Sequence, residues 1–178
     1  MSYYPENKGL YNRQYEHDNC GIGFVAQKFG RPSHQIISQG LEVLSNLRHR
    51  GAEGADNKTG DGAGITIQIP HELYTSQGIE LPEAGTYGTG LVFLPQIADE
   101  ASYCLKKAEE FAKAEGLQTV TTREVPVNTN ALGAIARKAM PEIRQLFVTG
   151  DFSRDTLERK LFFMRRNLEK HIENSALT

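Results

Sequence analysis

The most informative segment of the chain is Glu16-His17-Asp18-Asn19-Cys20-Gly21-Ile22-Gly23-Phe24-Val25. One cysteine stands at the front of a short apolar run, which predicts a buried strand from Cys20 to Gln27. Its small neighbours Gly21 and Gly23 allow backbone or substrate to approach the sulfur closely. Nineteen residues precede the cysteine, so the arrangement suggests a nucleophile that is uncovered when the chain is cut ahead of it.

A cysteine becomes an effective nucleophile when a neighbouring group removes the thiol proton, and papain-like enzymes use a histidine for this. The sequence offers no obvious histidine partner of that kind for Cys20. The alternative base is the cysteine's own α-amine, whose ordinary pKa of about 7.7–8.0 suits proton transfer near neutral pH. That amine exists only after the Asn19–Cys20 bond is cut. A buried cysteine that begins a core strand is the competing interpretation, and these residues alone leave both open.

The composition predicts one soluble domain. The chain has 178 residues, 39% of them hydrophobic, and a formal charge of −2 argues against binding to a nucleic-acid backbone. The sequence contains no apolar run long enough for a membrane span and no secretory signal at its start, so we expect a cytoplasmic protein. The two cysteines, Cys20 and Cys104, are too few for a disulfide scaffold or an iron–sulfur cluster, and we expect Cys104 in the core. The five histidines lack the close pairing of a helical zinc motif.

Two further motifs follow the cysteine. Residues 44–56 read LSNLRHRGAEGAD, and residues 59–65 read TGDGAGI. Together with CGIGFV at 20–25, these blocks resemble the start of the large subunit of glutamate synthase, which is a class II glutamine amidotransferase domain of the N-terminal nucleophile hydrolase type. The likeness runs from about Leu10 to the C-terminus and weakens after Pro70.

The resemblance implies an α+β fold of four layers, αββα, which is incomplete in this segment. Residues 1–19 are then a propeptide, and residues 20–178 are the N-terminal part of the amidotransferase domain. The Cys20 sulfur would attack the carbonyl of Asn19 to expel the propeptide. It would later attack the side-chain amide of glutamine, releasing glutamate and ammonia through a thioester.

In the full-length family protein the ammonia meets 2-oxoglutarate in a separate domain. FMN and an iron–sulfur cluster are implied for that protein, and we expect no cofactor or metal on this segment. The implied partners are glutamine and the remainder of the large subunit, with an electron-donating small subunit as a further candidate. No nucleic acid or membrane partner is expected.

The resemblance also implies supporting site residues. Arg50, in the His-Arg-Gly turn, would lie beside the nucleophile, although a solvated cation near a helix end is an alternative. Asp61 and Gly62 would pack nearby, and plain turn formation explains them as well. The glycines of this loop do not form a phosphate-binding loop, because they precede an alternating strand pattern at 65–69 in place of a helix.

Other elements follow from periodicity. Apolar residues at helical spacing after Ser33 predict a helix that ends near Arg48. Further along we expect strands at 87–94, 120–125 and 143–148, and helices at 97–116, 132–139 and 153–172.

Two alternatives to a glutaminase remain open. The segment could serve as a folding or assembly module with a silent, buried Cys20, or it could belong to an N-terminal nucleophile hydrolase that acts on another amide. The His-Arg-Gly and Gly-Asp-Gly blocks favour the glutamine family. In that family an Asn-Gly pair for the oxyanion and the groups that hold the substrate's α-carboxylate and α-amine lie C-terminal to the matched part. The segment alone should therefore be nearly inert.

Overall fold

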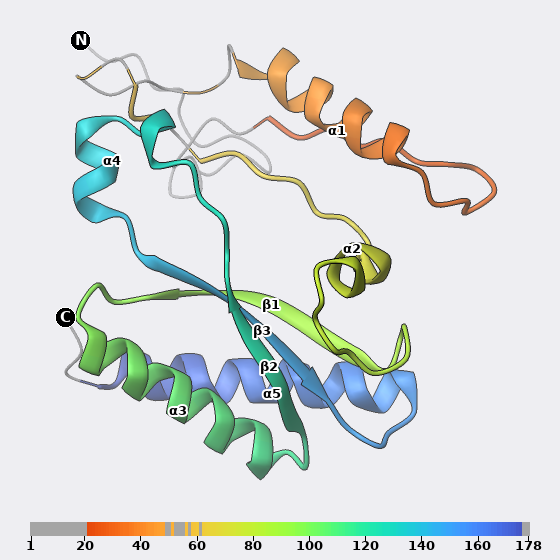
Figure 1. Cartoon of the computed structure of the whole chain (residues 1–178), viewed down its shortest axis with the longest axis vertical. Helices are drawn as coiled ribbons and strands as arrows, with labels where there is room; N and C mark the ends of the chain where they lie inside the picture. Colours follow the sequence, from red (N-terminus) through yellow and green to blue (C-terminus); the bar gives the residue numbers. More distant parts are fainter. Residues whose placement is uncertain (1–20, 49–50, 52–55, 57, 61, 176–178) are drawn as a thin grey trace, which may run out of the picture. The chain divides into compact units, whose positions relative to one another are not determined.

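The computed structural model describes residues 21–48, 51, 56, 58–60 and 62–175 (Figure 1). The chain divides into two compact units, Met1–Ile67 and Gln68–Thr178. The predicted site residues Asn19, Cys20, Arg50 and Asp61 lie outside the described residues.

The first unit contains the helix α1 (His34–Asn46). It forms where the sequence predicts it, with Ser33 as N-cap residue in an extended conformation. Among the described residues no side-chain hydrogen bond caps this end. At the other end the backbone N–H of Leu47 donates to the carbonyl of Val43 at 3.1 Å. The apolar stripe of α1 is half-buried except at Leu41, which is 53% exposed.

The prediction of strands at 20–27 and 65–69 is wrong for the residues that the structure describes. Residues 21–27 and 62–70 carry no strand assignment, and Ile22 and Phe24 are 88% and 90% exposed. Alternating side chains predict a strand, but a strand also needs a neighbour that takes its backbone N–H and C=O groups. Among the residues that the structure describes, neither segment has such a ladder.

The second unit is built on a three-stranded sheet of β1 (Tyr87–Leu94), β2 (Gln118–Glu124) and β3 (Glu142–Thr149). The strand order is β1-β3-β2, and β3 pairs antiparallel with both neighbours. The register of β1 with β3 runs unbroken, whereas a shift interrupts the pairing of β2 with β3 between Thr119 and Thr121. As the central strand, β3 carries the most buried residues, 145–148.

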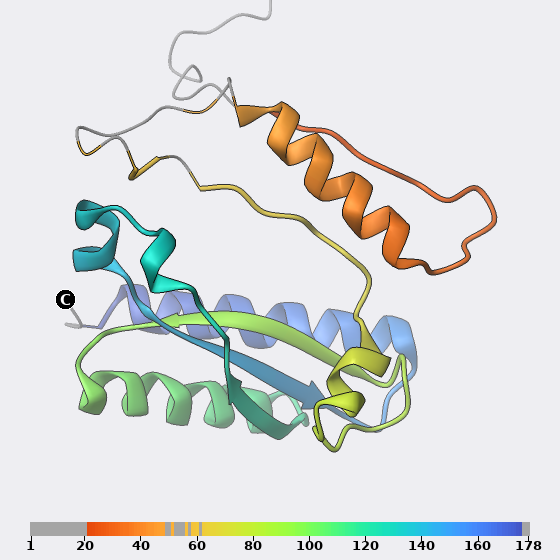
Figure 2. The ribbon, with the colours of Figure 1, turned by 45° about the horizontal axis from the view of Figure 1, so that its top comes forward.

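Two helices, α3 (Ala98–Ala114) and α5 (Arg154–Glu173), cover one face of this sheet (Figure 2). Gly116, two residues after the end of α3, has a φ of 75°, and the N–H of Leu117 donates to the Ala112 carbonyl at 2.8 Å. Glycine adopts this left-handed conformation without steric cost. The core between helices and sheet consists of Ala108, Ala112, Leu117, Leu146, Val148, Leu157 and Met164.

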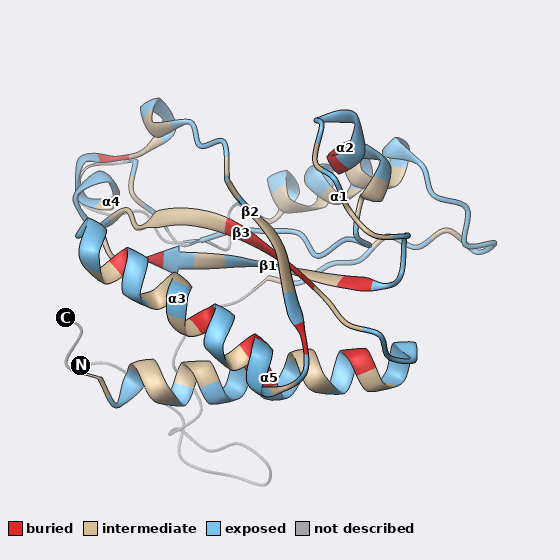
Figure 3. Ribbon diagram, turned by 60° about the horizontal axis from the view of Figure 1, so that its bottom comes forward, coloured by how far each residue is buried: buried red, intermediate tan, exposed pale blue. Residues whose placement is uncertain are grey.

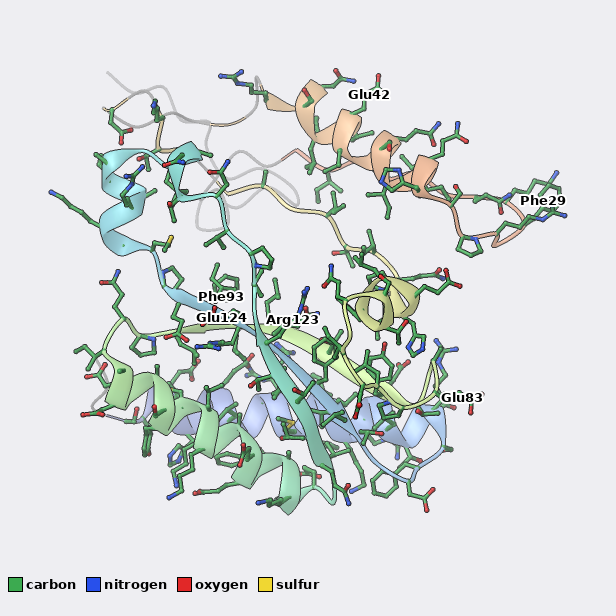
Figure 4. The ribbon with its side chains drawn as sticks, viewed as in Figure 1. Phe29, Glu42, Glu83, Phe93, Arg123 and Glu124 are labelled. Atoms are coloured by element: carbon green, nitrogen blue, oxygen red, sulfur yellow. The ribbon has the colours of Figure 1, made fainter. Side chains whose placement is uncertain are left out.

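The opposite face of the sheet is only partly covered. The short helix α2 (His71–Ser76) places Tyr74 beside Phe147, with ring centroids 5.1 Å apart. The buried Gln145 donates to the Tyr74 hydroxyl at 2.8 Å and accepts from Arg123 Nε at 2.8 Å. Further along this face, Phe93 is 65% exposed (Figure 4). Figure 3 shows an exposed stretch within β1. One half of the face is thus a satisfied polar and aromatic network, and the other half exposes apolar side chains.

The short helices η3 (Thr129–Ala131) and α4 (Ala134–Ala139) connect β2 to β3. The elements expected after residue 86 are confirmed, with 87–94 matching β1 at both ends. The described part of the chain is therefore α+β. None of its helices combines the length and apolar character that crossing a bilayer requires.

The expectation for Cys104 holds only in part. This cysteine is free and half-buried on α3. Burial raises the pKa of its thiol, and the nearby Glu100 carboxylate raises it further. Because thiolate is the reactive form, Cys104 is a poor nucleophile near neutral pH.

Candidate functional site

The segment that follows Cys20 packs closely on α1 through its glycines. A Cβ built on Gly21 would lie 3.2 Å from Leu47 Cδ2, and one built on Gly23 would overlap Val43 Cγ1. Val43 is β-branched and stiff in a helix, so it cannot easily give way. The two glycines of the cysteine motif therefore allow this backbone to lie against the C-terminal half of α1.

The same end of α1 leads along the chain toward Arg50. The N–H of Gly51 donates to the Arg48 carbonyl at 3.1 Å, a turn hydrogen bond that spans positions 49 and 50. Gly21 follows Cys20 directly, and Leu47 directly precedes this turn. The structure thus brings Gly21, which follows Cys20, close to Leu47, which lies three positions before Arg50, while Cys20 and Arg50 themselves lie outside the described residues.

The glycine-rich loop is organised by Asp56, which sequence reasoning missed. Its Oδ1 accepts from the N–H of Thr59 at 2.7 Å, and its Oδ2 accepts from Thr59 Oγ1 at 2.7 Å. The signal was present in the sequence as an aspartate three residues before a threonine, which is typical of a side-chain-capped turn. Gly62 is exposed, and no heavy atom lies within 4 Å of a Cβ built on it. The described contacts do not bring Gly62 to Gly21.

Replacing Gly23 and Gly40 by alanine should change the free energy of unfolding in opposite directions. Gly23→Ala is expected to destabilise the first unit by about 1–3 kcal/mol, because the new methyl group overlaps Val43. Gly40→Ala, in the middle of α1, meets nothing within 4 Å and should stabilise the helix by about 0.5–1 kcal/mol. Urea unfolding followed by circular dichroism measures both values. Equal effects of the two variants would contradict the packing.

Metal ligands are not grouped in the part of the chain that the structure describes. No cluster of three or more His, Cys, Asp or Glu side chains occurs there, and the whole sequence holds two cysteines. An iron–sulfur cluster takes four protein ligands, usually cysteines. The donor set of the described residues therefore does not fit such a cluster.

Comparison with known proteins gives a consistent result. The family model for class-II glutamine amidotransferases matches residues 20–178. The chain is 41% identical over 170 residues to the glutamate synthase [NADPH] large chain of Bacillus subtilis (strain 168), covering 93% of this chain and 11% of that relative. It is 37% identical over 163 residues to ferredoxin-dependent glutamate synthase 2 of Synechocystis sp. (strain ATCC 27184 / PCC 6803 / Kazusa), covering 88% of this chain and 10% of that relative.

A eukaryotic relative, glutamate synthase [NADH] of Saccharomyces cerevisiae (strain ATCC 204508 / S288c), is 34% identical over 188 residues, with 96% of this chain and 9% of the relative covered. The chain thus spans about a tenth of the length of these curated relatives. The family model matches nearly the whole chain and begins at the motif cysteine. The chain belongs to the class-II glutamine amidotransferase family.

Proposed function

We propose that this chain carries the nucleophile of a glutaminase that supplies ammonia inside a glutamate synthase. The observation that carries the proposal is the family match, which starts at residue 20 and leaves the nineteen residues before it outside. A match that begins at a cysteine is what an N-terminal nucleophile requires. The close packing of Gly21 and Gly23 on α1 supports it, because it gives the flanking backbone a defined position.

The propeptide leaves first. The Cys20 sulfur attacks the carbonyl carbon of Asn19, the peptide C–N bond breaks, and the acyl group passes to sulfur as a thioester. Water hydrolyses this thioester, which releases residues 1–19 as an acid. The thiol and a free α-amine remain on Cys20, and this amine can then act as the base.

Glutamine hydrolysis repeats the same chemistry. The α-amine takes the proton of the thiol, and the sulfur attacks the side-chain amide carbon of glutamine. The C–N bond breaks, and the departing nitrogen takes the proton from the amine and leaves as ammonia. Water then cleaves the thioester, giving glutamate and the free thiol. Arg50 is proposed to lie beside the sulfur, with Asp61 and Gly62 as further supports of the site.

The remaining site groups are proposed to come from polypeptide beyond these 178 residues. The curated relatives are about ten times longer than the part that they share with this chain. Loss of one oxyanion donor costs about a hundredfold to a thousandfold in rate, so residues 1–178 alone should be almost inactive. We place 2-oxoglutarate, FMN and the iron–sulfur cluster in the other domains, and the names of the relatives suggest NADPH, NADH or ferredoxin as the electron source.

The full fold is proposed to be the four-layer αββα sandwich. The sheet of the second unit has helices on one face and exposed apolar side chains, including Phe93, on the other. Such a face is what a second sheet would cover. We propose that segments 21–27 and 65–69, which the sequence predicts as strands, contribute strands to that second sheet.

Mass spectrometry of the longer protein tests the proposed function. The mature chain should begin at Cys20, and a diazoketone analogue of glutamine should add one label, on Cys20. Cys104 serves as the internal control, because its raised thiol pKa disfavours reaction. A mature protein that retains residues 1–19, or one that is labelled on Cys104 and not on Cys20, would contradict the proposal.

A further inference from the structure

In the described part of the second unit, one helix of the sheet, α3, connects two strands, whereas α5 follows a strand and leads to no further strand. β1 and β2 both run antiparallel to β3, so they are parallel to each other with β3 between them. The helix α3 links β1 to β2 and packs on the same face as α5. Nearly all connections between parallel strands of one sheet are right-handed. In the strand order β1-β3-β2, the crossover through α3 moves two strand positions, from β1 past β3 to β2.

The helix α5 starts a second connection of the same kind. It follows β3, which runs opposite to β1, and it lies on the same face as α3. A right-handed crossover that starts from a reversed strand on that face must move two positions in the opposite direction. Counting from β3 past β1, this position is the free edge of β1. The packing agrees, because a Cβ built on Gly88 of β1 would overlap Leu161 of α5.

The two edges of the sheet also differ in their chemistry. β1 reads YGTGLVFL, with no charged residue, no proline and an unbroken register. β2 carries a register shift, Arg123 and Glu124. Edge strands that stay unpaired are protected by charges, prolines or bulges. In the described part of the chain β2 carries such protection and β1 does not, and Leu91 of β1 is 52% exposed.

We infer that the free edge of β1 is the binding site for one more strand, supplied by polypeptide that follows α5 and running antiparallel to β1. The completed order is new strand-β1-β3-β2, which is the β-α-β-β-α-β arrangement with both helices on one face. The end of α5 lies near the Leu94 end of β1 in Figure 1. A chain that turns back at that point runs along β1 in the required direction. The relatives contain additional polypeptide far in excess of the matched part.

Hydrogen exchange in the full-length protein tests this inference without measuring activity. A strand with one neighbour protects alternate amides, whereas a strand with two neighbours protects consecutive amides. We expect amides 88–92 of β1 to be protected consecutively, as in the central strand β3. Alternating fast and slow amides in β1 would overturn the proposal.

A photo-cross-linker identifies the partner strand. A benzophenone attached to the Leu91→Cys variant of the full-length protein should cross-link to a peptide C-terminal to residue 178. Cross-linking to a second copy of β1, with protection that is lost on dilution, would overturn the proposal, and so would a peptide from residues 1–86. Neither readout uses glutamine, so the two proposals are tested separately. A negative result for the added strand does not contradict the glutaminase assignment, and a negative result for the glutaminase assignment does not contradict the added strand.

Discussion

Replacing Cys20 by alanine in the full-length protein is expected to lower glutamine hydrolysis about a thousandfold or more, and to leave residues 1–19 attached. The variant removes the atom that forms both thioesters, and loss of a nucleophile removes most of the catalytic acceleration in enzymes of this kind. Glutamate release from glutamine measures the first effect, and intact mass measures the second. Two independent readouts on one sulfur separate a catalytic role from a structural one.

The matched control is Cys104→Ala. Cys104 is half-buried on α3, and burial raises the pKa of its thiol. This variant should retain both glutamine hydrolysis and propeptide removal. Cys20→Ser should lie between the two, because a hydroxyl group can still attack but is the weaker nucleophile. Normal processing in Cys20→Ala would show that another agent cuts the chain, and normal turnover would exclude Cys20 as the nucleophile.

Replacing Phe147 by alanine is expected to destabilise the second unit by about 3–5 kcal/mol. Phe147 lies on the central strand, is 0% exposed, and contacts the rings of Tyr74 and Tyr87 at centroid distances of 5.1 and 6.2 Å. Removing its ring leaves a cavity between β3 and α2 and forfeits two aromatic contacts. Since a domain is stable by only about 5–15 kcal/mol, this variant should be unfolded in part at moderate urea concentrations.

Phe162→Ala is the control for this measurement. Phe162 lies on α5 and is exposed, so its loss should change the free energy of unfolding by about 0.5 kcal/mol or less. Urea unfolding measures both variants. Equal slopes of the unfolding free energy against urea concentration would show that both variants expose the same surface on unfolding. A cost for Phe147→Ala no larger than that of the control would mean that the sheet is not packed as described.

The elements after residue 86 were predictable because their signals are local and agree with one another. The run 87–94 is β-compatible and ends at Pro95, and the apolar positions of 97–111 recur at helical spacing up to Gly116. The helix α2 escaped prediction because it is only six residues long and lies beside a proline. Short helices depend on tertiary packing, here of Tyr74 on Phe147, more than on propensity.

The two strands around the motif show the limit of such reasoning. Segment 20–27 is an apolar, β-compatible run and segment 65–69 alternates apolar and polar residues, but such patterns specify only which faces a strand would present. Whether the backbone becomes a strand depends on a neighbour that is distant in the sequence. Similarly, the sequence motif points to Gly21 and Gly23 as small residues near the nucleophile, and only the structure shows that their partners are Leu47 and Val43.

The family, the candidate nucleophile and the helices and strands with local periodicity could all be read from the amino-acid sequence. The structure was needed to show which of those segments pair, which face of the sheet α3 and α5 cover, and which edge strand of the described sheet carries no protection. This division arises because side-chain period and turn residues act within a few positions of the chain. Strand pairing, burial and handedness, by contrast, arise from contacts between residues far apart in sequence.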